Sequence, residues 1–190
     1  KNTIENQMVA GWADYESMED AITELENLKD AGSENEVQVK RAEILLNLLG
    51  NTSGTGIFYV PLEENDKNGY DTLYFCDLNP ESYSRTNADI YGEYGNAAIM
   101  KTLGITMDVN WKAYADKNML ANSYITRPVE AYRENGYGEE TDYGCWTVGT
   151  LPYYQGLSCI MYTIPLLGDD GQVFAVLGIE ISMEYINTFL

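Results

Sequence analysis

The chain has 190 residues, no histidine, and 30 Asp and Glu against 11 Lys and Arg, which gives a formal net charge of −19 at pH 7. So few cations argue against a nucleic-acid surface and against adhesion to anionic lipid headgroups, because both depend on clustered Lys and Arg. The absence of histidine excludes imidazole bases, Ser-His and Cys-His pairs and histidine metal ligands. An apolar content of 45% is enough for one ordinary folded domain.

Residues 1 to about 30 have helical periodicity. Apolar residues recur at steps of three and four and draw one stripe: Ile4, Met8, Gly11, Tyr15, Met18, Ile22 and Leu25. Gly32 can close this helix, and Ser33 with Glu36 has the capping-box spacing that opens a second helix, which ends at Gly50. The heptad-like stripe fits either packing on the helix's own domain or a homodimer seam, and its length does not decide between them.

After residue 52 the pattern changes to short runs rich in aromatic and β-branched residues, which are typical of strands. The runs "IFYVPL" and "TLYFCDL" are joined by a segment whose Asn68-Gly69 pair is a strong turn signal. Residues 79–106 contain several glycines and a proline. They suit a loop with at most one helix, around Ala97 to Leu103.

The run "DVNWKAYADKNML" (108–120) predicts a helix with Asp108 as its N-cap. The next run, "SYITRPVEAY", is strand-like, and a polar, Gly-rich loop over 134–142 separates it from the strand-like "YGCWTVGTL". Two long apolar runs and a helix-like "MEYINTFL" follow. The order of elements has no βαβαβ alternation. It therefore predicts an α+β fold with a mixed, mainly antiparallel sheet of five to six strands, a long N-terminal helix and flanking helices.

The stretch "YTIPLLGDDGQVFAVLGIEIS" (162–182) predicts a hairpin, because "GDDG" supplies residues that accept the dihedral angles of a tight turn. Its second strand is apolar on both faces at its start, so we expect it in the middle of the sheet. Gly178 lets something approach the backbone closely, more often another part of the protein than a ligand. Glu180 lies near the strand's end, so we expect it to be solvated or to cap the last helix rather than to contact a cationic ligand.

The sequence "YGCWTVG…YTIPLLGDDGQVFAVLGIEIS" resembles the C-terminal half of Cache domains, the PAS-like extracytoplasmic sensors of bacterial receptors. The front is similar too, with a long helix, a Gly-rich turn and the strands "TGIFYV" and "YFCDLNP". The resemblance implies an N-terminal helical segment over 1–52, a sensor module over 53–190, and a ligand pocket between the sheet and residues from about 83 to 146. In amino-acid-binding members an "R-x-W-Y" element precedes the third strand. Here "VNWK" keeps only Trp111, so the arginine that would clamp a carboxylate is missing, which disfavours an α-amino acid ligand.

The resemblance also implies a function: the extracytoplasmic sensing part of a membrane receptor, such as a histidine kinase, diguanylate cyclase or chemoreceptor. Such a domain binds a small molecule and passes a conformational change to the membrane through flanking transmembrane segments. The chain starts and stops inside helical patterns, so we expect it to be a piece of a longer protein. We expect no enzymatic activity, cofactor or metal in it. Cys76, Cys145 and Cys159 fit buried packing thiols.

Ligand pockets are mostly apolar and aromatic with a few well-placed polar groups. On this ground and on the resemblance, the candidate ligand-binding residues are Trp111, Tyr114, Tyr124, Arg127, Tyr143, Trp146 and Tyr162. Taken singly, each aromatic residue fits the core or rim better than a ligand contact, and the group is assigned to a pocket because the resemblance implies one there. Arg127 fits a surface ion pair better than a bidentate grip on an anionic ligand.

Two other functions fit parts of the pattern. A pilin-like assembly subunit also places a long helix before an antiparallel sheet, but "KNTIENQMVAGW" is too polar for the apolar helix start that assembly needs. A carboxylate-based glycan hydrolase would need paired acids, for which Glu139, Glu140 and Asp142 are candidates. These acids lie in a polar, Gly-rich loop, where solvated turns are the simpler interpretation.

Overall fold

The computed structural model describes residues 15–29, 34–77, 79, 89–136, 138–150 and 158–187. Within them, a seven-stranded sheet has the order β4-β3-β2-β1-β7-β6-β5. The strands are β1 (Gly56–Pro61), β2 (Leu73–Asp77), β3 (Ile90–Tyr94), β4 (Thr106–Lys112), β5 (Cys145–Thr150), β6 (Ser158–Leu167) and β7 (Val173–Ser182). All neighbours pair antiparallel except β3 and β4, which are parallel. The predicted mixed, mainly antiparallel sheet is confirmed, with more strands than the five to six expected.

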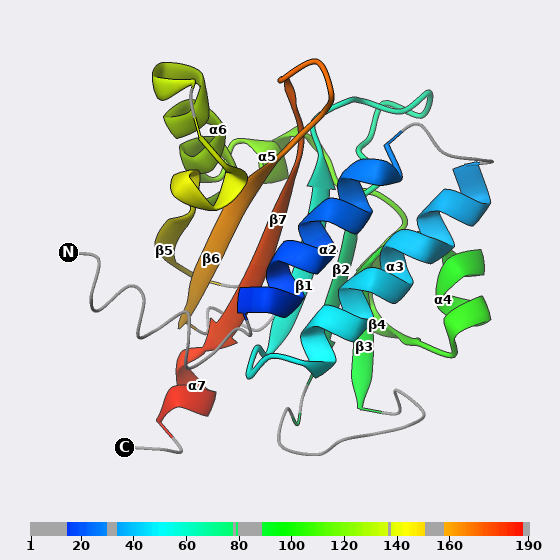
Figure 1. The fold of residues 1–190 in the computed structure, drawn as a ribbon. Coiled ribbons are helices and arrows are strands. Elements are labelled where there is room, and N and C mark those ends of the chain that lie inside the picture. Colours follow the sequence, from blue (N-terminus) through cyan, green and yellow to red (C-terminus); the bar gives the residue numbers. More distant parts are fainter. Residues whose placement is uncertain are drawn as a thin grey trace.

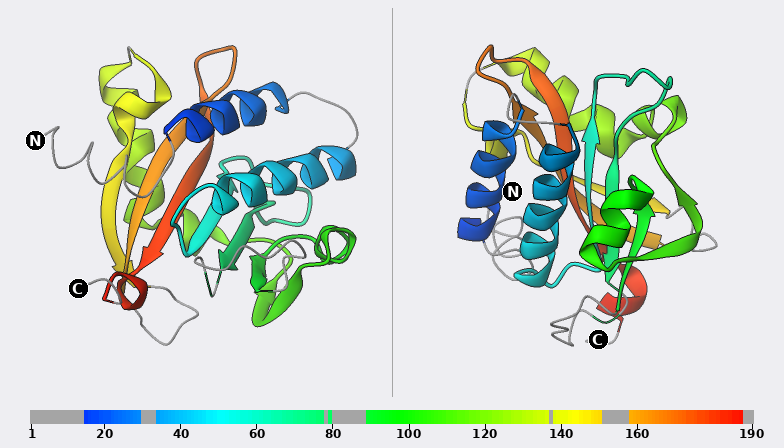
Figure 2. Two further views of the ribbon diagram at one scale, coloured as in Figure 1. Left: turned by 60° about the horizontal axis from the view of Figure 1, so that its bottom comes forward. Right: turned by 90° about the vertical axis from the view of Figure 1, so that its right-hand side faces the viewer.

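The helices lie on both faces of this sheet (Figures 1 and 2). They are α2 (Tyr15–Asn27), α3 (Glu34–Gly50), α4 (Ala97–Leu103), α5 (Lys117–Leu120), α6 (Ser123–Asn135), the short 3₁₀ helix η1 (Glu140–Tyr143) and α7 (Met183–Ile186). Helices α2, α3 and α4 pack on one face, and α5 and α6 on the other. The predicted α+β architecture with flanking helices is therefore confirmed.

The apolar stripe predicted for the first helix lies on α2 and packs on the domain's own sheet. Met18, Ile22 and Leu25 are buried in one apolar cluster with Leu45 and Leu48 of α3 and with strand residues. The described part of the stripe is thus used for intramolecular packing, the first of the two arrangements that its spacing allowed. The stripe residues before Tyr15, and the predicted Gly32 and Ser33 boundary signals, lie outside the described residues.

The C-terminal hairpin lies inside the sheet, as predicted. β7 pairs with β1 on one side and with β6 on the other. The turn between β6 and β7 contains Gly171 at φ 70, and the β1–β2 connection contains Asn68 at φ 56, both in the left-handed region that turn residues accept. Side chains alternate along the strands, so Ala175 and Leu177 face α2 and α3, whereas Val176 faces the α6 side.

The middle of the chain departs from the predictions. Residues 90–94 form β3 rather than loop, whereas the predicted helix at Ala97 to Leu103 is confirmed as α4. Residues 106–112 form strand β4, so the predicted helix over 108–120 is wrong over most of its length. The helix that does form is the short α5. Its N-cap is Asp116, whose side chain accepts from the backbone N–H groups of Asn118 and Met119.

The strand predicted for "SYITRPVEAY" is also wrong, because this segment forms helix α6. Tyr124, Ile125, Pro128 and Val129 recur at helical spacing and are buried on the sheet face formed by β5, β6 and β7. Burial of this apolar stripe outweighs the β propensity of the individual residues, which depends strongly on context. Arg127 therefore projects from an exposed helix position rather than from a strand.

Cys76 and Cys159 are buried and Cys145 is half-buried, and all three are free thiols, which fits their predicted packing role. Among the helices of the described ranges, none combines the length and the apolar character that a bilayer span requires.

Candidate ligand-binding site

The sheet face beneath α5 and α6 carries the candidate site. Its strands present the aromatic side chains of Phe58 and Tyr74, and α6 adds Tyr124. The Phe58 ring centroid lies 5.4 Å from that of Tyr74 and 5.6 Å from that of Tyr124. Two almost completely buried glutamates belong to the site: Glu180, which is hydrogen-bonded to Tyr74 of this group, and Glu93, which lies close enough to Glu180 to feel its charge. Mostly apolar walls with a few polar groups are typical of small-molecule sites.

Glu180 is 1% exposed and is held by hydrogen bonds on β7. The Tyr74 hydroxyl donates to one carboxylate oxygen, and the Thr55 hydroxyl lies 3.4 Å from the other. A Cβ on Gly56 would lie 3.3 Å from the Glu180 carboxylate, so glycine leaves room for this side chain. Burial raises the pKa of Glu180 to about 7, although both hydrogen bonds act in the opposite direction.

Glu93 is equally buried and has no hydrogen-bond partner within the described residues. It is 1% exposed, and neither carboxylate oxygen meets a donor. Burial, followed by the nearby charges of Asp108 and Glu180, raises the pKa of Glu93 to about 7. Native proteins rarely leave a buried carboxylate unpaired, because the desolvation of such a group is costly. A hydrogen-bond donor from outside the described part of the chain would therefore stabilise the Glu93 carboxylate.

Glu93 and Glu180 form an acidic cluster, whose charges raise the pKa values of neighbouring groups. Burial and the Glu180 charge raise the pKa values of Tyr74 and Cys76 well above their ordinary range. The pKa of Tyr124 rises to about 12 through burial and the neighbouring Cys159 and Glu180. No described lysine or arginine contributes to the pKa of Glu93 or of Glu180. The site can thus accept a cation without displacing one of the described basic side chains.

Most of the predicted site residues do not converge on this cluster. Tyr124 lies in it, but Trp146 and Tyr162 contact each other in a tilted arrangement with ring centroids 4.9 Å apart, and Tyr162 packs on the α2 side of the sheet. Arg127 donates to the Trp146 carbonyl at 3.2 Å, and Tyr143 makes an edge-to-face contact with a helix tyrosine.

Trp111 and Tyr114 line a separate cavity of about 220 Å³ near the start of α3. Trp111 also donates through Nε1 to the Gly95 carbonyl at 2.9 Å. The predicted set is therefore distributed over both faces and one edge of the sheet. Of this set, only Tyr124 lies near Glu180 in the aromatic group beneath α6.

The sequence did not reveal the acidic character of the site. Glu180 was expected to be solvated or to cap the last helix. The structure contradicts both, because Glu180 is buried and the hydroxyl of Ser182 caps α7. Glu93 was missed altogether. The available signal was the presence of Glu93 near aromatic residues in "IYGEY" and of Glu180 in the apolar "VLGIEIS". Charged side chains are rarely buried in such segments unless they are paired.

Comparisons with known proteins address the fold. Scans against protein-family models and against curated proteins gave no match. Among solved structures, the periplasmic sensory domain of the Campylobacter jejuni chemoreceptor Tlp1 is similar, with a TM-score of 0.56 and 12% identity over 90% of this chain. The chain has the fold of that sensory domain. The PAS-like sensor fold predicted from the sequence is thereby confirmed.

Other similar structures have lower scores. The extracellular domain of the putative histidine kinase mmHK1S-Z3 has a TM-score of 0.47 and 15% identity, over 97% of this chain and 55% of that one. The ligand-binding domain of C. jejuni Tlp3, solved with L-valine, has a TM-score of 0.46 and 12% identity, over 91% and 57%. The chain spans about half the length of these structures, and 54% of the Tlp1 domain.

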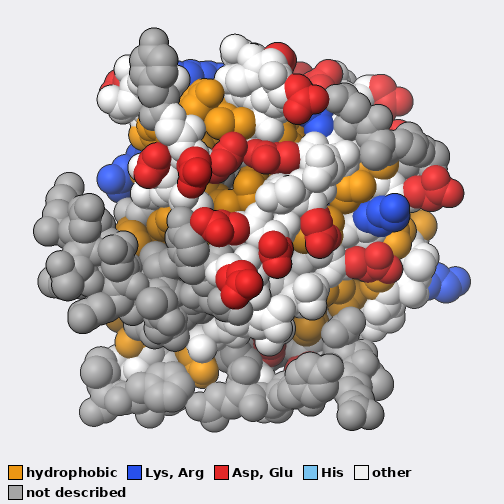
Figure 3. Space-filling model, in the orientation of Figure 1, with side chains coloured by type: hydrophobic (Ala, Val, Ile, Leu, Met, Phe, Trp, Pro, Cys, Tyr) orange, Lys and Arg blue, Asp and Glu red, His pale blue; other side chains and the backbone are white. Residues whose placement is uncertain are grey.

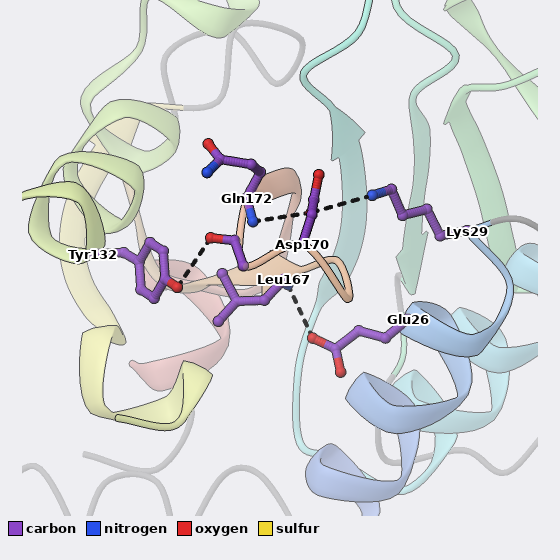
Figure 4. A network of polar contacts seen from close by, with 7 residues as sticks. Glu26, Lys29, Tyr132, Leu167, Asp170 and Gln172 are labelled. Carbon is purple, nitrogen blue, oxygen red and sulfur yellow. Dashed lines mark hydrogen bonds and ion pairs between the residues drawn. The ribbon is translucent and has the colours of Figure 1, made fainter. Parts of the chain in front are cut away.

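In this sensory-domain fold, the turn between β6 and β7 contacts helices from both faces of the sheet (Figure 4). Glu26 of α2 accepts a hydrogen bond from the Leu167 N–H at 2.9 Å, and Lys29 lies 3.6 Å from the Asp170 carboxylate. From α6, the Tyr132 hydroxyl donates to the Gly171 carbonyl at 3.1 Å. The turn therefore joins the helix that covers the site to the helix on the opposite face.

Removing the α6 contact to the turn is expected to cost a single hydrogen bond. Tyr132→Phe should lower the free energy of unfolding by about 1 kcal/mol, the usual net value for a neutral hydrogen bond. Urea denaturation of the two proteins side by side measures this difference. Equal midpoints would mean that the contact does not hold the turn. Tyr114→Phe, on a tyrosine outside this network, controls for the loss of a hydroxyl.

The surface of the sensory-domain fold over α2 and α3 is strongly acidic (Figure 3). Exposed acids on these helices are Glu16, Glu19, Asp20, Glu24, Glu34, Glu36 and Glu43. Much of the charge of −19 is thus solvated, where it contributes to solubility and attracts cations from a distance. The buried glutamates of the candidate site differ from these acids in lacking water around them.

Proposed function

We propose that the chain is the extracytoplasmic ligand-sensing domain of a membrane receptor, such as a histidine kinase, diguanylate cyclase or chemoreceptor. It binds a small molecule under α6 and passes a conformational change to the membrane. The likeness in fold to the Tlp1 sensory domain supports a sensor, and the unpaired buried carboxylate of Glu93 supports binding. Because one fold hosts many functions, the ligand is argued from the site itself.

The ligand of this proposal carries a positive charge. The observation that supports it is Glu93, a buried carboxylate without a donor within the described residues, placed beside Glu180 in a site without a described cation. A primary or quaternary amine would offset the desolvation of both carboxylates, and the Phe58, Tyr74 and Tyr124 rings suit its apolar part and its charge. Among the predicted ligand contacts, the proposal retains Tyr124.

The proposal includes no catalytic activity, cofactor or metal in this chain. Among the acids considered for hydrolysis, Glu139 and Asp142 form the capping box of η1, in which each side chain accepts from the other's backbone N–H. Such a reciprocal cap gives these acids a structural task. Homodimerisation through the N-terminal helix also belongs to the proposal, and it would use a face other than the buried Met18–Leu25 stripe.

A thermal-shift screen tests the ligand class. Putrescine, choline and ethanolamine are compared with succinate and acetate at about pH 8, where both glutamates ionise. An amine present at about 100 times its Kd should stabilise the fold by roughly 2.7 kcal/mol, which raises Tm by several degrees. Carboxylates should give no shift.

The Glu93→Gln variant makes this screen specific. It should lose most of the amine-induced shift, because it removes the unpaired charge while keeping the size of the side chain. Glu139→Gln, which removes one exposed carboxylate, is the matched control and should keep the shift. The proposal is wrong if carboxylates stabilise the chain and amines do not, or if Glu93→Gln responds to amines like the unmodified chain.

A further inference from the structure

We infer that the chain has a second binding site, at the other end of β2, for a small uncharged polyol of about the size of a monosaccharide. The site is the cavity of about 220 Å³ enclosed by the start of α3, the segment before β2, the start of α4 and the end of β4. The lining residues that would contact this ligand are Gln38, Thr72, Trp111 and Tyr114. Glu180 lies opposite Gly56, which pairs with Cys76 at the far end of β2, so the two sites are separate.

The observation that points to a ligand is an unpaired buried hydroxyl. Thr72 lines the cavity and is fully buried, and its Oγ1 has no hydrogen-bond partner within the described ranges. Gln38, a second polar side chain on the wall, is only 8% exposed. An unsatisfied buried hydroxyl costs about 1–3 kcal/mol, which a ligand that hydrogen-bonds to it would recover.

Contacts within the chain hold the wall of this cavity in place. The backbones of Tyr70 and Ala115 exchange hydrogen bonds at 3.0 and 2.9 Å, which fixes the segment before Thr72 against the end of β4. The indole of Trp111 is held by its hydrogen bond to the Gly95 carbonyl. Tyr114 packs on Gly69, where a Cβ would come within 2.4 Å of the ring. Two positioned aromatic side chains and two buried polar groups are therefore present before any ligand enters.

The charge of the walls favours a neutral ligand. The buried polar groups, Gln38 and Thr72, are uncharged, and two charged lining residues of opposite sign, Glu34 and Lys67, are exposed. Asp71 is half-buried and already accepts from the Asn65 amide at 2.8 Å. A charged ligand group placed against the buried Gln38 and Thr72 side chains would be desolvated beside uncharged partners, which is unfavourable. A polyol offers hydroxyls to the polar groups and C–H surface to the aromatic ones.

The volume sets the size of the ligand. At roughly 30 Å³ for each water, the cavity of about 220 Å³ corresponds to about seven waters. It is smaller than the roughly 300–1,000 Å³ of pockets for drug-sized ligands. A monosaccharide or a cyclitol fits this volume, whereas an oligosaccharide does not.

Titrations followed by NMR test the inference. The ¹⁵N-labelled chain is titrated with D-glucose, D-galactose and myo-inositol, and with glucosamine and glucuronate as charged counterparts. At least one neutral compound should cause saturable shifts of the Trp111 indole and Gln38 amide signals. Gln38→Leu should weaken this binding about tenfold, as expected for the loss of about 1.4 kcal/mol of hydrogen bonding. Thr147→Val is the matched control, since its hydroxyl is also buried and unpaired within the described residues but lies on β5.

Three results would overturn the inference: no saturable shift with any neutral compound up to about 50 mM, binding of the charged counterparts alone, or unchanged affinity in Gln38→Leu. If Gln38→Leu does not fold, Thr72→Val replaces it. Removal of an unpaired hydroxyl is expected to leave the fold intact, so a loss of affinity there reports on binding. The outcome is independent of the amine site, because amines should shift signals around Glu93 and leave those of Trp111 unchanged.

Discussion

Raising the pH from about 5 to about 8 is expected to destabilise the ligand-free chain by several kcal/mol. The pKa of Glu180 is about 7 in the folded chain, because the side chain is buried, against an ordinary value of 4.5. Between these values the folded chain keeps a proton that the unfolded chain has released, so the free energy of unfolding falls by about 1.4 kcal/mol for each pH unit. This contribution is complete below pH 4.5 and is lost as the pH rises through 7. It amounts to about 3 kcal/mol for Glu180, and Glu93 acts in the same direction.

Glu180→Gln isolates this contribution. Glutamine can still accept from the Tyr74 hydroxyl but does not ionise, so at about pH 8 the variant should be more stable than the unmodified chain by about 3 kcal/mol. This corresponds to roughly 6–12 °C in Tm for a domain of this size. Urea unfolding across the pH range measures the difference, which should vanish at low pH. Glu184→Gln, an exposed position on α7, controls for the loss of one charge from an acidic protein. Parallel pH profiles for Glu180→Gln and the unmodified chain would contradict the assignment.

Gly178→Ala is expected to destabilise the chain strongly. Gly178 lies opposite Phe58 in the β1–β7 pairing, and a Cβ there would lie 2.1 Å from the Phe58 ring. The ring is fully buried between Tyr74 and Tyr124, so it cannot move without displacing both. Overpacking of this kind costs about 1–3 kcal/mol and sometimes more. The partner that approaches Gly178 is thus another part of the protein, the more frequent of the two possibilities that the sequence left open.

The same variant should also weaken amine binding, since the displaced rings border Glu180. Phe58→Leu in the Gly178→Ala background makes room for the added methyl group and should recover part of the stability. Gly149→Ala on β5 is the matched control, because its Cβ would meet no atom closer than 3.8 Å. Chemical denaturation of these variants gives the comparison. If Gly178→Ala were as stable as Gly149→Ala, the close packing of Phe58 on the strand would be refuted.

The elements that the sequence predicted correctly are those whose turn residues and hydrophobic pattern lie within one short stretch of the chain. The C-terminal hairpin has its turn residues and its alternation within one stretch, and its position in the middle of the sheet is confirmed. The alternation holds from Ala175 onward, whereas Val173 and Phe174 lie on the opposite faces to those expected, next to a register shift in β6. Strand β4 has no such pattern, because five of its residues are exposed and its pairing with β3 is parallel and depends on the intervening α4. Helix α6 contains a proline and β-branched residues, which disfavour a helix in a sequence-based prediction. Its apolar stripe identifies it as a helix only once the sheet face that it covers is known.

The candidate site was less predictable for the same reason. Tyr124 was selected for its type alone, and it does lie beside the acidic cluster. Glu180 was noticed but assigned to solvent, because the end of a strand is often exposed. Its burial comes from pairing with Gly56 of β1 and from contact with Thr55 just before that strand, both of which are far away in the sequence. Glu93 is buried only because β2 and β4 flank its strand, and a single sequence does not specify such neighbours.

The turn between β6 and β7 also offers a spectroscopic readout. The amide of Leu167 is bound by Glu26 of α2, whereas the carbonyl of Gly171 is bound by Tyr132 of α6. Exchange of the Leu167 amide proton with deuterium therefore requires α2 to release the turn. A ligand that tightens α6 over the sheet would slow this exchange on the opposite face. The exchange rate of this one amide proton therefore shows, without any label on the ligand, whether ligand binding beneath α6 changes the contact of α2 on the opposite face of the sheet.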